Sequence, residues 1–390
     1  MDRVYLDHNA TSPLRPLARE AMLAALAETG NASSVHREGQ AARARVEHAR
    51  AQVAALVGVD PRAVFFTSGA TEAIAAALSP ELEVSARAVA CDVLLISAIE
   101  HPAVRAGGRF SADKTETIPV DGSGVVNLAA LEMMLTEHKN ARRKPFVSAM
   151  AANNETGVVQ PLGEIAQLVH AAEGVFHVDA VQIVGRYPFD LETSGADLIS
   201  ISSHKLGGPQ GAGAMIARDA DTRIPPLLRG GGQERGTRAG TENVAAIAGF
   251  GAASEEAATA LAEEASRLAS LREQMENGIR TILPSAVVFS EAALRVPNTT
   301  CFAVPTMSAE TALIAFDLAS VAVSSGSACS SGKVAASETL KAMNVDSELA
   351  KCAIRVSTGW STTKADIARF LEVFARVYAP VIQTSRTKAA

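Results

Sequence analysis

Short apolar segments alternate with helical patterns along much of this chain, and this alternation restricts its possible folds more than any other feature. The apolar segments cover residues 93–96, 146–150, 175–178 and 198–201, and a helical pattern over 163–172 separates two of them. Strands that are apolar throughout are typical of parallel sheets, because helices cover both faces of such a sheet. The sequence therefore predicts an α/β fold with a mainly parallel sheet.

A second pattern, near the N-terminus, predicts a helix, a strand, a tight turn and another helix in succession. Apolar residues recur at helical spacing over 38–57, and Gly58 provides a stop. The apolar run 63–66 follows, and the turn 67–71 leads into an Ala-rich helical stretch. Backbone N–H groups at the start of that helix can bind a phosphate, although simple helix capping is the more common reason for such a turn.

The length of the chain favours two domains, since a single core rarely grows beyond about 300 residues. We predict a large α/β domain over residues 14–255 and a smaller α+β domain formed by residues 1–13 and 256–390. A long, Ala-rich and charged helix is expected from residue 252 to about residue 282, at the start of the second part.

Composition and charge exclude several classes of protein. The net charge is −6 and no block of like charges occurs, so neither a nucleic acid nor a membrane surface is expected as a partner. The N-terminus lacks a signal-peptide pattern and no apolar run reaches the ~18 residues of a membrane span, which favours a cytoplasmic protein. The four cysteines lie far apart without a CxxC pair, so we expect free thiols and no metal site: Cys91, Cys301, Cys329 and Cys352.

Polar residues accumulate just after the apolar segments, where ligands bind in open parallel sheets. Asp179 directly follows the segment 175–178, and Lys205 lies shortly after the segment 198–201. A surface ion pair is the usual role of an Asp and a Lys near one sheet edge. Lys205 nevertheless precedes the glycine-rich stretch 207–213, where other backbone can approach and desolvate its amine. A neutral lysine amine is what Schiff-base chemistry requires.

A carboxylate, such a lysine and a phosphate-binding turn together match the needs of pyridoxal phosphate, whose protonated ring acts as an electron sink. His101 follows another apolar segment and can lie over the ring, although a hydrogen-bonded structural histidine is the commoner case. The stretch 153–157 can contribute to the same site or form a simple turn. The combination favours a pyridoxal-phosphate site over the separate alternatives.

Longer motifs make the chain resemble a known family. The sequence is similar to the cysteine desulfurases of the NifS/IscS class, which are fold type I pyridoxal-phosphate enzymes of the class-V aminotransferase family. The matching motifs span most of the chain in family order: YLDHNAT (5–11), TSGATEA (67–73), EHPAV (100–104), NNETGVVQP (153–161), HVDAVQ (177–182), SSHKLGGPQGAG (202–213), GGGQERGTRAGTENV (230–244) and SSGSACSSG (324–332). The resemblance implies a fold type I architecture with pyridoxal 5'-phosphate as cofactor.

The resemblance also implies roles for individual residues. Lys205 would bind the cofactor covalently, Asp179 would partner the ring nitrogen, and Gln182 would donate a hydrogen bond to the ring oxygen. His101 would stack on the ring as an acid or base. The remaining residues would bind the cofactor phosphate (Ala70, Thr71, Ser202 and His204), the phosphate of the partner subunit (Thr241) or the substrate carboxylate (Asn154 and Arg355), and Asn154 would also contact the cofactor. Position 203 is Ser where relatives more often carry Gly or Ala, which implies an extra hydroxyl at the phosphate site.

Cys329 stands in the Ser- and Gly-rich stretch 324–332. A Walker-type phosphate loop is excluded, because the glycine spacing is one residue too long and Val334 replaces the required Ser or Thr. A buried structural thiol is the commonest state of a free cysteine, but this composition makes a poor core element. We therefore expect a flexible loop that presents a reactive thiolate. The other three cysteines are expected to be structural.

The activity that the resemblance implies is conversion of L-cysteine to L-alanine. The sulfur would pass to Cys329 as a persulfide and then to a sulfur-acceptor protein such as an iron–sulfur scaffold, in an obligate homodimer. A selenocysteine lyase, or a related fold type I lyase or aminotransferase, is the nearest alternative. A non-catalytic scaffold is more remote because the four expected catalytic and cofactor residues are all present: Lys205, Asp179, His101 and Cys329. A nicotinamide-binding protein is disfavoured because no G-x-G-x-x-G motif follows a strand.

Overall fold

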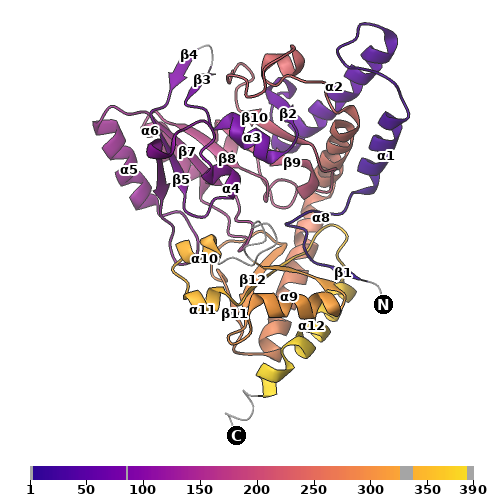
Figure 1. The fold of residues 1–390 in the computed structure, drawn as a ribbon, viewed down its shortest axis with the longest axis vertical. Coiled ribbons are helices and arrows are strands. Elements are labelled where there is room, and N and C mark those ends of the chain that lie inside the picture. The colour runs from indigo at the N-terminus through magenta and orange to yellow at the C-terminus, as the bar shows by residue number, and fades with distance from the viewer. Residues whose placement is uncertain (1–2, 85–86, 326–336, 384–390) are drawn as a thin grey trace.

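The computed structural model describes residues 3–84, 87–325 and 337–383. Two parts are stacked along the long axis of the molecule, and the long helix α8 (Val244–Ile282) extends from one part into the other (Figure 1). The upper part in that view carries a seven-stranded sheet, and the lower part carries a four-stranded sheet.

The seven-stranded sheet is mainly parallel, which confirms the predicted fold class. Five neighbouring strands, β9, β8, β7, β5 and β6, run parallel to one another. Strand β10 is antiparallel to both of its neighbours, β2 and β9. In spatial order the strands are β2 (Val64–Thr67), β10 (Gly213–Ala217), β9 (Leu198–Ser202), β8 (Val175–Asp179), β7 (Pro145–Met150), β5 (Val93–Ser97) and β6 (Thr115–Ile118).

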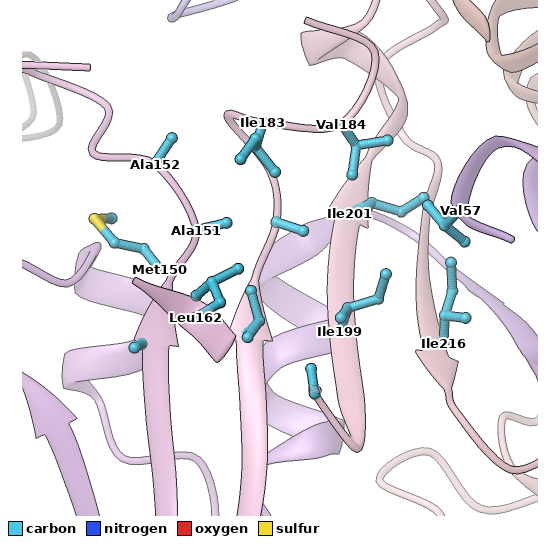
Figure 2. Close-up of a cluster of buried hydrophobic side chains, with 14 of the residues drawn as sticks. Val57, Met150, Ala151, Ala152, Leu162, Ile183, Val184, Ile199, Ile201 and Ile216 are labelled. Atoms are coloured by element: carbon cyan, nitrogen blue, oxygen red, sulfur yellow. The ribbon is translucent and has the colours of Figure 1, made fainter. Parts of the chain in front are cut away.

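Both faces of this sheet are buried, because successive side chains of a strand point to opposite sides. On β7, Phe146 packs into one apolar cluster and Val147 into another. Figure 2 shows part of the second cluster, in which Ile199 and Ile216 lie with Val57 of a covering helix. The continuous apolar character of the strands is explained by this double cover.

Helices of the N-terminal two thirds supply that cover. Helices α2, α5 and α6 contribute to one cluster, and α3 and α4 contribute to the other. Gly58 ends α2 in the left-handed conformation (φ 73°), as the sequence predicts. The helices are α1 (Pro16–Leu26), α2 (Arg37–Val57), α3 (Ala70–Ala77), α4 (Pro102–Arg105), α5 (Leu128–Asn140), α6 (Leu162–Ala171) and α7 (Leu191–Ser194), and a small hairpin pairs β3 (Glu81–Val84) with β4 (Arg87–Ala90).

Helix α8 begins earlier than the sequence predicts. It starts at Val244, where Asn243 caps it by accepting a hydrogen bond from the N–H of Ala246, and not at residue 252. Its first turns pack on α1 and α2, and its last turns belong to the core of the lower part. The predicted domain boundary at residues 255 and 256 falls inside this continuous helix and stays a prediction.

The lower part is an antiparallel sheet covered by helices. Strand β1 at the start of the chain pairs in parallel with β13, so the N-terminal segment joins this part. Thr363 and Asp366 form the capping box that the sequence predicts for α12. The sheet order is β11 (Val287–Val288), β12 (Thr299–Ala303), β15 (Ala353–Ser357) and β14 (Ser324–Ser325), and the remaining elements are β1 (Val4–Tyr5), β13 (Val321–Ala322), α9 (Ala309–Leu318), α10 (Glu338–Ala342), α11 (Ser347–Ala350) and α12 (Lys364–Val377).

Within the described ranges, no helix combines the length and the apolar character needed to cross a bilayer.

Candidate active site

A cavity of about 580 Å³ lies outside the carboxyl ends of β8 and β9, where the strand rule places ligands. The start of α3, the segment after β1 and strand β15 complete its walls. The cavity brings together most of the predicted site residues: Ala70, Thr71, His101, Asn154, Asp179, Gln182, Ser202, His204, Lys205 and Arg355.

Lys205 reaches the cavity from a short 3-10 turn that directly follows β9. Its Nζ atom donates hydrogen bonds to the backbone carbonyl oxygens of Asn9 and Ala10, both at 2.7 Å. Asn9 and Ala10 also line the cavity. The amine is therefore held by main-chain acceptors from the N-terminal segment, to which sequence reasoning assigned no role.

Asp179 is the last residue of β8, is buried and lines the cavity. Burial raises the pKa of its carboxyl to about 6, although a hydrogen bond from the N–H of Val181 at 3.1 Å and the charge of Lys205 oppose this shift. The carboxyl is thus mainly ionised at neutral pH. A carboxylate in this position can hold a proton on a ring nitrogen.

Two histidines line the same cavity. The Nδ1 atom of His101 accepts a hydrogen bond from the N–H of Ala103 at 3.1 Å, which places the ring at the start of α4. Burial, with the charge of Lys205, lowers the pKa of His101. Burial also lowers the pKa of His204 to about 4, assisted by the charges of Lys205 and Arg186. Both rings are therefore neutral at pH 7 and can accept or donate protons.

The turn before α3 leads directly into the helix that the sequence predicts, and its phosphate-binding role stays a prediction. Helix α3 begins at Ala70, so the backbone N–H groups of its first turn lack partners within the helix, and Ala70, Thr71 and Ser202 line the cavity. A Cβ on Gly213 would lie 2.6 Å from the carbonyl carbon of Gly69, so β10 can approach the turn only with glycine at this position.

The Ser203 hydroxyl lies elsewhere, contrary to the expectation from the sequence. Ser203 is fully buried and is not among the residues that line the cavity. A Cβ added to Gly208 would collide with Ser203 Oγ, which shows that the hydroxyl faces that glycine. The Ser203 side chain therefore points away from the cavity that Ser202 and His204 line.

Arg355 projects from β15 and is almost completely buried. Its Nη1 atom donates to the carbonyl oxygen of Asn154 at 3.0 Å, and its Nη2 atom donates to Asp7 Oδ1 at 2.7 Å. In the described part of the chain its Nε atom is buried without a hydrogen-bond partner. Spare donors on a fixed guanidinium suit recognition of a substrate carboxylate.

Thr241 does not line this cavity. It lies in a separate pocket of about 210 Å³ that also contains Glu234 and Arg238. The loop is fixed there by a buried ion pair in which Arg50 Nη1 lies 2.7 Å from Glu234 Oε2. A single chain does not test whether Thr241 serves a partner subunit, so that role stays a prediction.

Cys329 and most of its Ser- and Gly-rich stretch lie outside the described residues. The other three cysteines are buried, and burial raises the pKa of each thiol, that of Cys91 to about 12. Cys91, Cys301 and Cys352 are therefore poor nucleophiles at neutral pH, because the thiolate is the reactive form.

The donors and acceptors of the cavity fit pyridoxal phosphate. A lysine amine, a buried carboxylate and free helix N–H groups correspond to the aldehyde, the ring nitrogen and the phosphate of that cofactor. The residues that sequence reasoning missed are the acceptors of Lys205 and the groups behind Gln182 and Arg355: Asp7, Asn9, Ala10 and Arg186.

Comparison with known proteins gives the same assignment. The sequence profile of the family described as Aminotransferase class-V matches residues 4–370. The chain is 41% identical over 381 residues to the cysteine desulfurase of Cereibacter sphaeroides, covering 96% of this chain and 95% of that protein. It is 38% identical over 384 residues to the cysteine desulfurase IscS of Dictyoglomus turgidum, covering 96% and 94%.

The fold has solved counterparts as well. The X-ray structure of a NifS-like protein from Rickettsia africae superposes with a TM-score of 0.86 at 35% identity, covering 97% of this chain and 99% of that one. Sequence, fold and cavity agree, and the chain belongs to the cysteine desulfurases of the pyridoxal-phosphate-dependent class-V aminotransferase family.

Proposed function

We propose that this protein converts L-cysteine to L-alanine and transfers the sulfur to Cys329 as a persulfide. The observation that carries the proposal is that Lys205, Asp179 and Arg355 line one cavity. A Schiff-base amine, an acid that keeps a pyridine ring protonated and a carboxylate-binding guanidinium are the groups that a pyridoxal-phosphate enzyme needs for an amino acid.

Pyridoxal phosphate supplies an electron sink when bound. Arg355 and Asn154 orient the substrate carboxylate, and the freed amine of Lys205 takes the proton from the α-carbon. The Cys329 thiolate attacks the substrate sulfur, forming a sulfur–sulfur bond as the carbon–sulfur bond breaks. The electron pair of that bond remains on the substrate carbon, which takes up a proton and becomes the methyl group of alanine, and Lys205 returns the first proton to the α-carbon.

The same proposal includes three features beyond the chemistry. The chain acts as a homodimer in which Thr241 completes the partner's phosphate site. The persulfide passes to an acceptor protein such as an iron–sulfur scaffold. The enzyme works in the cytoplasm on cysteine, and selenocysteine lyase activity is the alternative that a comparison of the two substrates would reveal.

Two variants test the function. Lys205→Ala should abolish the visible absorbance of the covalently bound cofactor, and Cys329→Ala should keep that absorbance but release no sulfide when cysteine and a reductant are added. Alanine and sulfide are measured together on the wild-type protein. Normal sulfide release by Cys329→Ala, or an unchanged spectrum for Lys205→Ala, would refute the assignment. Cys91→Ala is the matched control and should turn over normally.

A further inference from the structure

Arg186 is a buried cation just behind the cavity wall. Its side chain is only 7% exposed, and burial lowers its pKa to about 9, which still leaves it charged at neutral pH. All of its hydrogen bonds in the described part of the chain go to uncharged acceptors: Asn9 Oδ1 at 2.9 Å, His8 O at 3.0 Å, Lys205 O at 2.7 Å and Gln182 Oε1. None of these partners is a carboxylate.

Burial of a charge without an ion-pair partner lowers the stability of the folded protein. We therefore expect Arg186 to have a role other than packing. The acceptors of Arg186 are not scattered. Asn9, Gln182 and Lys205 all line the cavity, and they come from three separate stretches of the chain. The guanidinium therefore connects three segments of the chain that line the cavity.

Its contact with Gln182 fixes which end of that amide faces the cavity. The Oε1 atom accepts from Arg186 Nη1, so the Nε2 atom lies on the other side, where it donates to Asn9 O at 3.1 Å. A reversed amide would place N–H groups against the guanidinium, which carries only donors. Gln182 must therefore present a donor to anything bound beside it.

The charge of Arg186 also reaches the cavity. It is one cause of the lowered pKa of His204, which lines the cavity, and of His8, which lies behind it. A positive charge in this position favours an anionic oxygen over its protonated form nearby. The other charged or titratable groups around the cavity are Glu72, His101, Asp179, Lys205 and Arg355.

We propose that Arg186 is a positioning residue of the cofactor site: it turns the Gln182 amide so that its N–H faces the ring oxygen, and its charge favours the ionised form of that oxygen. The inference rests on the proposed function only through the cofactor. It assigns Arg186 no contact with substrate and no proton transfer.

A double-mutant cycle tests the orientation. Arg186→Lys keeps the positive charge but removes the guanidinium group, which donates to several acceptors at once. Gln182→Ala removes the side-chain amide. Each variant of the cofactor-free protein should bind pyridoxal phosphate about tenfold more weakly in equilibrium dialysis, and the double variant should be no weaker than Gln182→Ala alone. Losses that multiply in the double variant would overturn the orienting role. Arg218→Lys, an exposed arginine, is the matched control and should bind normally.

Titration tests the charge. Arg186→Met should raise the pKa of His204, which is measured by NMR on the cofactor-free protein. It should also raise the pKa that is read from the visible absorbance of the bound cofactor. Arg186→Lys should leave both pKa values near those of the wild type. Circular dichroism establishes that each variant is folded, and if Arg186→Met does not fold, Arg186→Gln replaces it. If Arg186→Met or Arg186→Gln is folded and both pKa values equal those of the wild type, the inference is overturned. Absence of sulfide release by the wild-type protein would instead refute the proposed function.

Discussion

Arg355 donates from Nη2 to Asp7 Oδ1 at 2.7 Å, so the arginine proposed to bind the substrate carboxylate already holds a carboxylate of the chain. The other oxygen of Asp7 accepts from Ser324 Oγ at 2.9 Å, on the strand that leads into the Cys329 stretch. One carboxylate therefore connects the proposed substrate-binding arginine to the base of the segment that carries the nucleophile.

Asp7 should affect substrate affinity in opposite directions depending on its replacement. Asp7→Asn keeps an acceptor for Arg355 but removes a negative charge near the substrate carboxylate, so KM for cysteine should fall about threefold. Asp7→Ala also frees the guanidinium, and KM should rise about threefold because orientation is lost. Initial-rate kinetics measure both. Ser324→Ala, which leaves the Arg355 contact intact, is the control, and equal KM values for the two Asp7 variants would contradict this account.

Glu155 should make the protein less stable as the pH rises. Burial raises its pKa to about 7, against hydrogen bonds from Ser337 Oγ at 2.5 Å and Thr339 Oγ1 at 3.2 Å and the charge of Arg355. A carboxyl with a raised folded pKa binds its proton more tightly in the folded state. Its stabilising effect is therefore complete below about pH 4.5 and is lost as the pH rises toward 7.

Glu155→Gln mimics the protonated carboxyl, so it should gain stability relative to wild type between pH 4.5 and pH 8 by roughly 3 kcal/mol. Urea unfolding followed by circular dichroism at the two pH values measures the difference. The exposed residue Glu348 supplies the control variant Glu348→Gln, which should show no such trend. A gain that is the same at both pH values would indicate that titration of Glu155 is not the cause.

The core of the lower part should depend strongly on Phe316. Its ring stacks on Phe370 with centroids 5.6 Å apart, and the side chain is fully buried. Phe316→Ala should lower the free energy of unfolding by about 3–5 kcal/mol, because it leaves a cavity. Ile314→Ala on the same helix is the matched control: Ile314 is 57% exposed, so its loss should cost about 0.5 kcal/mol or less. Equal effects would mean that α9 does not pack as described.

The role of Thr241 can be tested in a mixed dimer of two different variant chains. If it serves the partner's phosphate site, a mixed dimer of Lys205→Ala and Thr241→Ala chains contains one complete site, with Lys205 from one chain and Thr241 from the other. That site should bind pyridoxal phosphate as tightly as wild type, whereas the Thr241→Ala homodimer should bind about tenfold more weakly. Weak binding in the mixed dimer would assign Thr241 to its own subunit.

The positions of β2, β5, β7, β8 and β9 could be predicted from the sequence because these strands are largely apolar, and the polar residues that follow them mark the strand ends. Strand β6, with the sequence TETI, was missed because it has no apolar run. Asp179 and Lys205 lie where this pattern predicts. The start of α8 was missed because its first turns are rich in Ala and Gly, which have weak periodicity. The hairpin β3–β4 was missed because it is short and largely exposed.

The acceptors of Lys205 could not be derived from local pattern. Asn9 and Lys205 are 196 positions apart, and no periodicity connects them. Arg186 was missed for a related reason, since a buried cation with uncharged partners is rare and its sequence context resembles a surface arginine. The YLDHNAT motif matched the family and so marked this segment as part of the shared pattern. The match did not predict that Asn9 and Ala10 accept hydrogen bonds from Lys205.

The parallel pairing of β1 with β13 has a consequence for biosynthesis. The ribosome releases Val4 early, but its partner Val321 only after most of the chain is made. The large sheet is complete once β10 has emerged, whereas the cavity also needs Arg355 from β15. The walls of the cavity are therefore complete only after residue 355 has left the ribosome.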